Sequence, residues 1–150
     1  MTRGRAPLLA FALAGALIAA ALPARLVPPV GMARAEHQVS YRYVVLGYVT
    51  DAENRGRRGV RVELQREKTG FSYLGETDAD GFYVIVARLG DESAGETLRL
   101  RAESQAMSLT VRFDPDDHAT ERGTRVDFFA RRPVETPTAF AGTLKRYLAQ

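Results

Sequence analysis

Residues 77–83 (TDADGFY) constrain the fold most, because they predict a tight turn that leads directly into a buried strand. Aspartate side chains accept hydrogen bonds from the backbone of a turn and glycine tolerates positive φ, so Asp78, Asp80 and Gly81 predict the turn itself. The apolar, β-prone run at residues 82–87 (FYVIVA) is typical of a central strand. We therefore expect a hairpin around which the other strands are arranged.

Short segments in which apolar and polar residues alternate lie on both sides of this hairpin. Val60, Val62 and Leu64, for example, alternate with polar residues, as in a strand with one buried face. Gly47 lies inside the first such segment and predicts a bulge or a close backbone approach. The pattern predicts an all-β sandwich of seven strands, at residues 41–50, 60–67, 71–77, 82–89, 97–103, 107–113 and 124–130.

Three motifs in the first half of the chain follow one another in a recognisable order. Residues 47–51 (GYVTD) are followed by residues 59–64 (GVRVEL) and then by the turn at residues 77–83. In order and spacing, over about residues 43–89, they resemble the carboxypeptidase regulatory-like family. The resemblance implies a seven-stranded transthyretin-like (prealbumin-like) β-sandwich. It also implies an interaction or structural accessory role outside the cytoplasm, although the fold itself hosts many functions.

The N-terminal segment has the three-part layout of a secretory signal peptide. Two arginines precede an uncharged apolar run at residues 7–22, and residues 33–35 (ARA) offer a small-x-small cleavage pattern. We expect a cut after Ala35 and export to the periplasm or the extracellular space. One alternative is a cut after Ala21. The other is an uncleaved leader that anchors the protein, since residues 6–24 approach the ~20 apolar residues that span a bilayer.

Composition excludes several classes of function. The chain has no cysteine, which excludes disulfides, thiolate catalysis, cysteine-based zinc sites and lipoprotein anchoring. Loss of the four arginines of the predicted leader would leave 17 basic against 18 acidic residues. A nearly neutral domain has no extended positive field for nucleic acid. We therefore expect no nucleic-acid partner and, once the leader is cleaved, no membrane association.

Residues 114–123 (DPDDHATERG) predict an acidic loop. Carboxylates and an imidazole within a few residues could bind a divalent cation, but the same residue types are common in solvated turns. The candidate ligands are Asp114, Asp116, Asp117, His118 and Glu121. The aspartates of the turn at residues 78–81 resemble the start of a calcium loop, but the apolar strand that follows offers no further ligands, so we expect a structural turn.

No catalytic constellation is recognisable. The chain has two histidines, His37 and His118, and no Gly-x-Ser-x-Gly elbow for a serine nucleophile. Intradiol dioxygenases have a related sandwich core and bind iron through two tyrosines and two histidines, a set that a domain with one histidine cannot supply. We predict that the protein is not an enzyme and needs no cofactor.

The C-terminal tail differs from the strands before it. Pro133 and Pro137 should interrupt any strand, and Thr136 followed by Pro137 predicts the capped start of a helix. One face of that helix carries four apolar residues, Phe140, Leu144, Tyr147 and Leu148. Because so short a helix is marginal alone in water, this face should dock on the sandwich, on a partner or on a membrane surface.

We therefore expect three parts: a signal peptide at residues 1–35, a sandwich domain at residues 36–132 and a tail at residues 133–150. The expected function is that of an exported, non-catalytic module that binds another envelope or extracellular protein, or serves as a structural accessory in the cell envelope. The alternative is a small-ligand or divalent-metal carrier.

Overall fold

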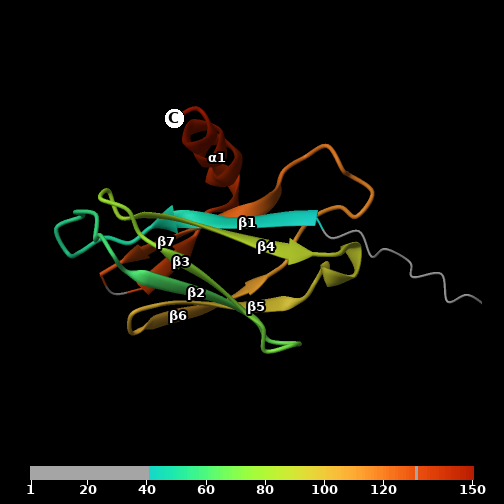
Figure 1. Ribbon diagram of the computed structural model, residues 1–150, viewed down its shortest axis with the longest axis horizontal. Helices are drawn as coiled ribbons and strands as arrows, with labels where there is room; N and C mark the ends of the chain where they lie inside the picture. The colour runs from blue at the N-terminus through green and yellow to red at the C-terminus, as the bar shows by residue number, and fades with distance from the viewer. Residues whose placement is uncertain (1–40, 131) are drawn as a thin grey trace, which may run out of the picture. The chain divides into compact units, whose positions relative to one another are not determined.

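The computed structural model describes residues 41–130 and 132–150, which form two four-stranded sheets and a C-terminal helix (Figure 1). The predicted signal peptide lies outside the described residues. Sheet I has the strand order β4–β1–β7–β8 and sheet II the order β3–β2–β5–β6. The strands are β1 (Tyr41–Tyr48), β2 (Arg61–Arg66), β3 (Ser72–Glu76), β4 (Phe82–Leu89), β5 (Thr97–Ala102), β6 (Gln105–Thr110), β7 (Arg122–Phe129) and β8 (Arg132–Glu135).

The alternation in the sequence accounts for the core between the sheets. Leu64 of β2 lies opposite Leu100 of β5, and both side chains are completely buried. Val45, Ile85 and Phe128 meet them from sheet I in one apolar cluster. Each such side chain contributes about 1.5–3 kcal/mol on burial. The all-β prediction is confirmed.

The close approach predicted at Gly47 is confirmed. A β-carbon there would lie 1.7 Å from the carbonyl oxygen of Val126 on β7. The same oxygen accepts a hydrogen bond from the buried Tyr83 hydroxyl at 2.8 Å, and Tyr83 lies opposite Gly47 in the β1–β4 register. Burial raises the pKa of Tyr83 well above its usual value, so this hydroxyl stays a donor. Because glycine at position 47 has no side chain, β1 can approach β7 closely enough for Tyr83 of β4 to reach the carbonyl of Val126.

The prediction of seven strands missed β8. Pro133 does not interrupt the sheet but lies within β8, opposite Phe128 of β7. A proline has no N–H to donate, and β8 is an edge strand whose outer side needs no donor. Sheet I therefore continues to Glu135, beyond the point where the sequence predicted the tail to begin.

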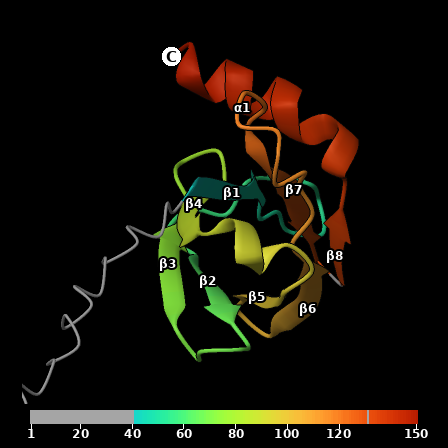
Figure 2. The same cartoon turned by 90° about the vertical axis from the view of Figure 1, so that its right-hand side faces the viewer.

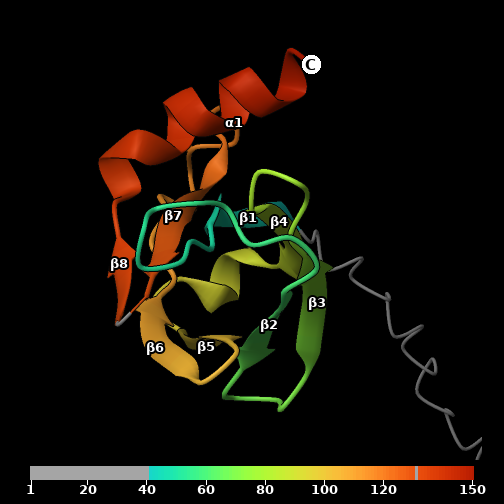
Figure 3. The ribbon, with the colours of Figure 1, turned by 90° about the vertical axis from the view of Figure 1, so that its left-hand side faces the viewer.

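The predicted C-terminal helix is present. Pro137 occupies the first position of a 3-10 turn (Pro137–Ala139) that leads into α1 (Phe140–Leu148). Thr136 occupies the predicted N-cap position of this turn, but its side chain makes no capping hydrogen bond. The helix lies across the outer face of sheet I, away from sheet II (Figures 2 and 3). Within the described ranges, no helix has the length and apolarity needed to cross a bilayer.

The turn predicted at residues 78–81 is confirmed in detail. Asp78 Oδ1 accepts hydrogen bonds from the backbone N–H groups of Asp80 and Phe82, both at 2.9 Å, and Gly81 has a φ of 76°. The carbonyl of Gly81 also accepts a hydrogen bond from Val49 N at 2.8 Å, which ties the hairpin to the end of β1. Asp78 therefore shapes the turn, and Gly81 joins it to the neighbouring chain.

Gly81→Ala should lower the free energy of unfolding by roughly 2–4 kcal/mol, for two reasons. Alanine is strained at a positive φ, and its β-carbon would overlap with neighbouring backbone atoms. A β-carbon at Gly81 would lie 2.4 Å from Val49 O and 2.7 Å from Arg57 N. Gly70→Ala is the matched control, since Gly70 has a similar φ of 72° but no atom within 4 Å of its would-be β-carbon. Urea unfolding of both variants measures the difference. Equal losses would contradict the close approach at Gly81.

Candidate functional site

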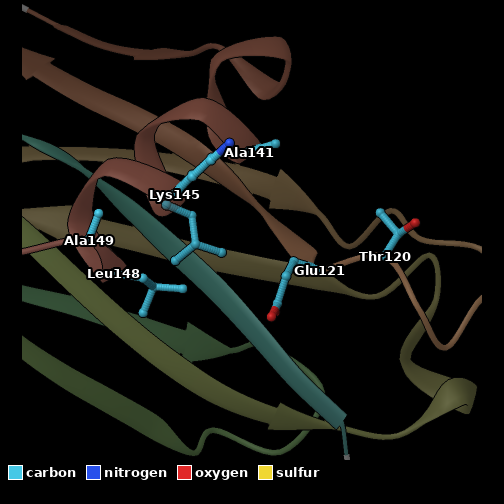
Figure 4. Close-up of a pocket in the computed structure, with 7 residues that line it drawn as sticks. Thr120, Glu121, Ala141, Lys145, Leu148 and Ala149 are labelled. Atoms are coloured by element: carbon cyan, nitrogen blue, oxygen red, sulfur yellow. The ribbon is translucent and has the colours of Figure 1, made fainter.

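An apolar groove of about 380 Å³ runs between α1 and the loop at residues 114–121 (Figure 4). We call it the α1 groove. Its helical wall consists of residues spaced three and four apart, which places them on one face of α1. The lining residues are Ala141, Leu144, Lys145, Leu148 and Ala149 of the helix with Thr120 and Glu121 of the loop. The helix thus offers one face to sheet I and an adjacent face to the groove.

Apolar packing seats α1 on sheet I. Phe140 and Leu144 are buried against Val44 and Leu46 of β1. The Phe140 ring also lies against the backbone of Gly123, where a β-carbon would come within 2.5 Å of Phe140 Cζ. Any side chain at position 123 would therefore push the helix away from the sheet.

A buried polar network fixes α1 to β7. Asp127 is 93% buried; it pairs with Arg125 at 2.9 Å and accepts a hydrogen bond from Tyr48 N at 3.0 Å. Arg125 Nη1 in turn donates to the hydroxyl of Thr143 at 3.0 Å, and that hydroxyl donates to the carbonyl of Ala139 at 2.8 Å. Because Arg125, Asp127 and Thr143 each have hydrogen-bond partners, this network adds directional contacts to the apolar packing of the helix.

Arg122 organises the opposite wall of the α1 groove. Its side chain is 95% buried and pairs with Asp91 at 2.8 Å. The guanidinium lies 4.1 Å above the centre of the Phe113 ring, within the range of a cation–π contact. It also donates to three loop carbonyls at 3.2–3.3 Å, those of Asp114, Pro115 and Asp117. The buried Arg122 side chain therefore fixes the conformation of the loop through three of its carbonyl groups.

Two aspartates of this loop, Asp114 and Asp117, accept hydrogen bonds from the loop's own backbone. Asp117 Oδ1 accepts hydrogen bonds from the backbone of Ala119 and Thr120, and bonds from Thr120 hold the pKa of Asp117 below its usual value. Asp114 accepts from Asp116 N at 2.9 Å. These carboxylates are acceptors in local turns, as the alternative interpretation of the loop expected.

The five candidate ligands do not converge on a cation site. Glu121 pairs with Arg42 on β1, and His118 Nε2 lies 4.0 Å from a carboxylate oxygen of Asp91. Across residues 41–130 and 132–150, no three His, Asp or Glu side chains lie together in a way that could hold a metal ion. His37, the other histidine, lies outside the described residues.

The four apolar residues proposed for partner docking divide into two pairs. Phe140 and Leu144 are buried on the protein's own sheet, so their surfaces are already used. The ring of Tyr147 packs against that of Phe82, with 5.4 Å between the ring centres, but Tyr147 is still 41% exposed. Leu148 lines the groove and is 63% exposed. Only the second pair offers surface to another molecule.

Sequence reasoning missed the buried arginine of β7, Arg122. Arg122 lies on the same face of the strand as Val126 and Phe128, two residues that are buried in the core. The predicted strand began at residue 124, which left Arg122 in the loop. An arginine in phase with the buried residues is the signal that would have identified it.

Comparison with known proteins gives no family. No family model matches the chain. No curated protein matches it. Among solved structures, it is similar to the dioxygenase domain of a dioxygenase carbohydrate-binding protein fusion from the cellulolytic bacterium Streptomyces sp. SirexAA-E, with a TM-score of 0.42 and 16% identity over 63% of this chain and 82% of that chain. At this TM-score the similarity carries no argument about activity.

Arg122→Met should lower the free energy of unfolding by about 2–4 kcal/mol, because it keeps the aliphatic stem but leaves Asp91 and three carbonyls without their donor. Amide hydrogen exchange at Ala119 and Thr120 should accelerate more than exchange in β1, since the loop loses its anchor. Arg88→Met, at an exposed position of β4, is the control and should change stability by less than about 0.5 kcal/mol. Unchanged loop exchange in Arg122→Met would contradict the anchoring role.

Proposed function

We propose that the protein is an exported, non-catalytic β-sandwich module that binds another envelope or extracellular protein. We further propose that its fold is the transthyretin-like sandwich of the carboxypeptidase regulatory-like family. Support for the fold comes from the places of the three motifs: residues 47–51 end β1, residues 59–64 enter β2, and residues 77–83 join β3 to β4. Support for export comes from the leader pattern of the sequence.

The observation that supports a binding role is the exposed apolar surface at the α1 groove. Leu148, which lines the groove, leaves 63% of its surface uncovered, and Tyr147, the residue before it on α1 but outside the groove, leaves 41% uncovered. Large apolar side chains beside a concave surface are typical of interaction sites. The helix that carries them is itself well seated, so the surface is presented in a fixed position.

The chemistry of the groove indicates what it would accept. Its floor is aliphatic, and its rim has one carboxylate, that of Glu121, and one ammonium group, that of Lys145. Because Glu121 already pairs with Arg42, the charged groups lie at the rim and the floor of the groove offers only apolar contacts. It fits an uncharged segment of a partner protein that inserts an aliphatic or aromatic side chain between α1 and the loop.

The same groove supports the alternative of a small-ligand carrier. A volume of about 380 Å³ lies at the lower end of the range of ligand pockets, roughly 300–1,000 Å³. An apolar molecule could occupy it in place of a partner's side chain. Transport of a divalent metal gains no such support, because the acidic loop uses its carboxylates for its own turns.

The binding proposal predicts that Leu148→Asp weakens the complex at least about tenfold, because it places a charge in the apolar contact. A photo-reactive side chain at Ala141 in the full chain would label the partner in the exported fraction. The labelled protein would then be purified and titrated against wild type and variant. Ser108→Asp, at an exposed position on β6 of the other sheet, is the control and should leave the dissociation constant unchanged.

Two outcomes would count against protein binding. Equal affinities for wild type and Leu148→Asp would remove the groove from the interface. Absence of any labelled partner, together with tight binding of the neutral dye N-phenyl-1-naphthylamine that Leu148→Asp abolishes, would favour the ligand carrier.

A further inference from the structure

Strand β3 is an edge strand that lacks the usual protection of an edge. It forms one margin of sheet II (Figure 3). Its five residues include no proline, lysine or arginine, and Glu76 at its end is the one charged residue. Leu74 in its centre is 63% exposed, and Phe71 just before it is 59% exposed. An exposed apolar edge of this kind is a template for pairing with another strand.

The backbone groups available at this edge follow from the pairing with β2. Arg66 N donates to Phe71 O at 2.8 Å, and Thr77 N donates to Val60 O at 3.0 Å, so the odd-numbered residues of this segment direct their backbone groups toward β2. In an antiparallel pair these directions alternate along the strand. The N–H and C=O groups of Ser72, Leu74 and Glu76 therefore point to the open side.

We propose that two copies of this chain associate through β3, antiparallel, with a twofold axis at Leu74. The two sheets II would then form one continuous sheet. The proposal concerns a different sheet from the α1 groove and does not depend on the proposed function.

The sequence of β3 is complementary to itself in this register. Leu74 lies opposite Leu74 of the second copy, so the two exposed side chains cover each other across the axis. Ser72 lies opposite Glu76, which places the two carboxylates at opposite ends of the pair and avoids like-charge contact. Tyr73 lies opposite Gly75, a pair that carries no charge, and both residues already pack against β4 of their own copy.

The other edge of sheet II is less suited to pairing. Strand β6 exposes Ala106, Ser108 and Thr110, which are small or polar, so pairing there would bury little apolar surface. On sheet I, β8 contains Pro133 and a charge at each end, Arg132 and Glu135, features that discourage pairing. A five-residue strand gives a small interface, so the dimer should be weak and dependent on concentration.

Cysteine substitution tests the register, because the chain has no cysteine of its own. Opposite residues in a hydrogen-bonded antiparallel pair have Cα atoms about 5.5 Å apart, within the range that a disulfide bridges. Under mild oxidation, full-length Leu74→Cys should form a covalent dimer. Ser72→Cys alone should not, but a mixture of Ser72→Cys with Glu76→Cys should, since those two positions face each other. Ser108→Cys controls for random collision.

Sedimentation equilibrium of cysteine-free protein supplies the second measurement. Leu74→Lys places two ammonium groups at the axis and should weaken dimerisation at least about tenfold, whereas Ser108→Lys should leave it unchanged. Both positions are exposed, so both variants should unfold at the wild-type temperature. A wild-type protein that stays monomeric up to about 1 mM, or Ser72→Cys crosslinking as fast as Leu74→Cys, would overturn the proposal. Neither result would affect binding at the α1 groove.

Discussion

The packing of α1 against sheet I is the contact on which the proposed binding surface at the α1 groove depends. A nine-residue helix has little stability alone in water. It persists here because Phe140 and Leu144 cover Val44 and Leu46, on a face of β1 that would otherwise be exposed. Gly123 leaves room for the Phe140 ring, and Arg125, which pairs with Asp127, donates a hydrogen bond to the hydroxyl of Thr143. Without this seat the α1 groove would have no helical wall.

The two sheets use their outer surfaces differently. Sheet I carries α1 on its outer face, and Leu148 of the helix, at 63%, is more exposed than Val86, Phe129 or Val134 of the strands. The described residues place no helix over sheet II, and its exposed large apolar residues lie at one edge, at Leu74 and Phe71. Because Leu148 and Leu74 belong to different layers, the surface proposed for a partner and the surface proposed for a second copy can each be altered without the other.

Local patterns predicted most of the fold and little of the site. Seven of the strands follow from alternation or from β-prone apolar runs, and the turn at residues 78–81 follows from the preferences of aspartate and glycine. Strand β8 was missed because Pro133 argues against a strand unless its edge position is known. The role of Arg122 depends on its contacts with Asp91, which is distant in the sequence, and with the loop at residues 114–117, which has no regular pattern. The face on which α1 docks depends on tertiary packing, so the sequence left that choice open.

Hydrogen exchange of the α1 amides in the full chain tests the central claim most directly. If the helix is an integral part of the sandwich, the amide of Leu144 should exchange with a protection close to that of Val45 in the buried strand β1. Exchange of Leu144 at the rate of an unstructured peptide, with Val45 still protected, would contradict the account, because the helix and its groove would then form only transiently.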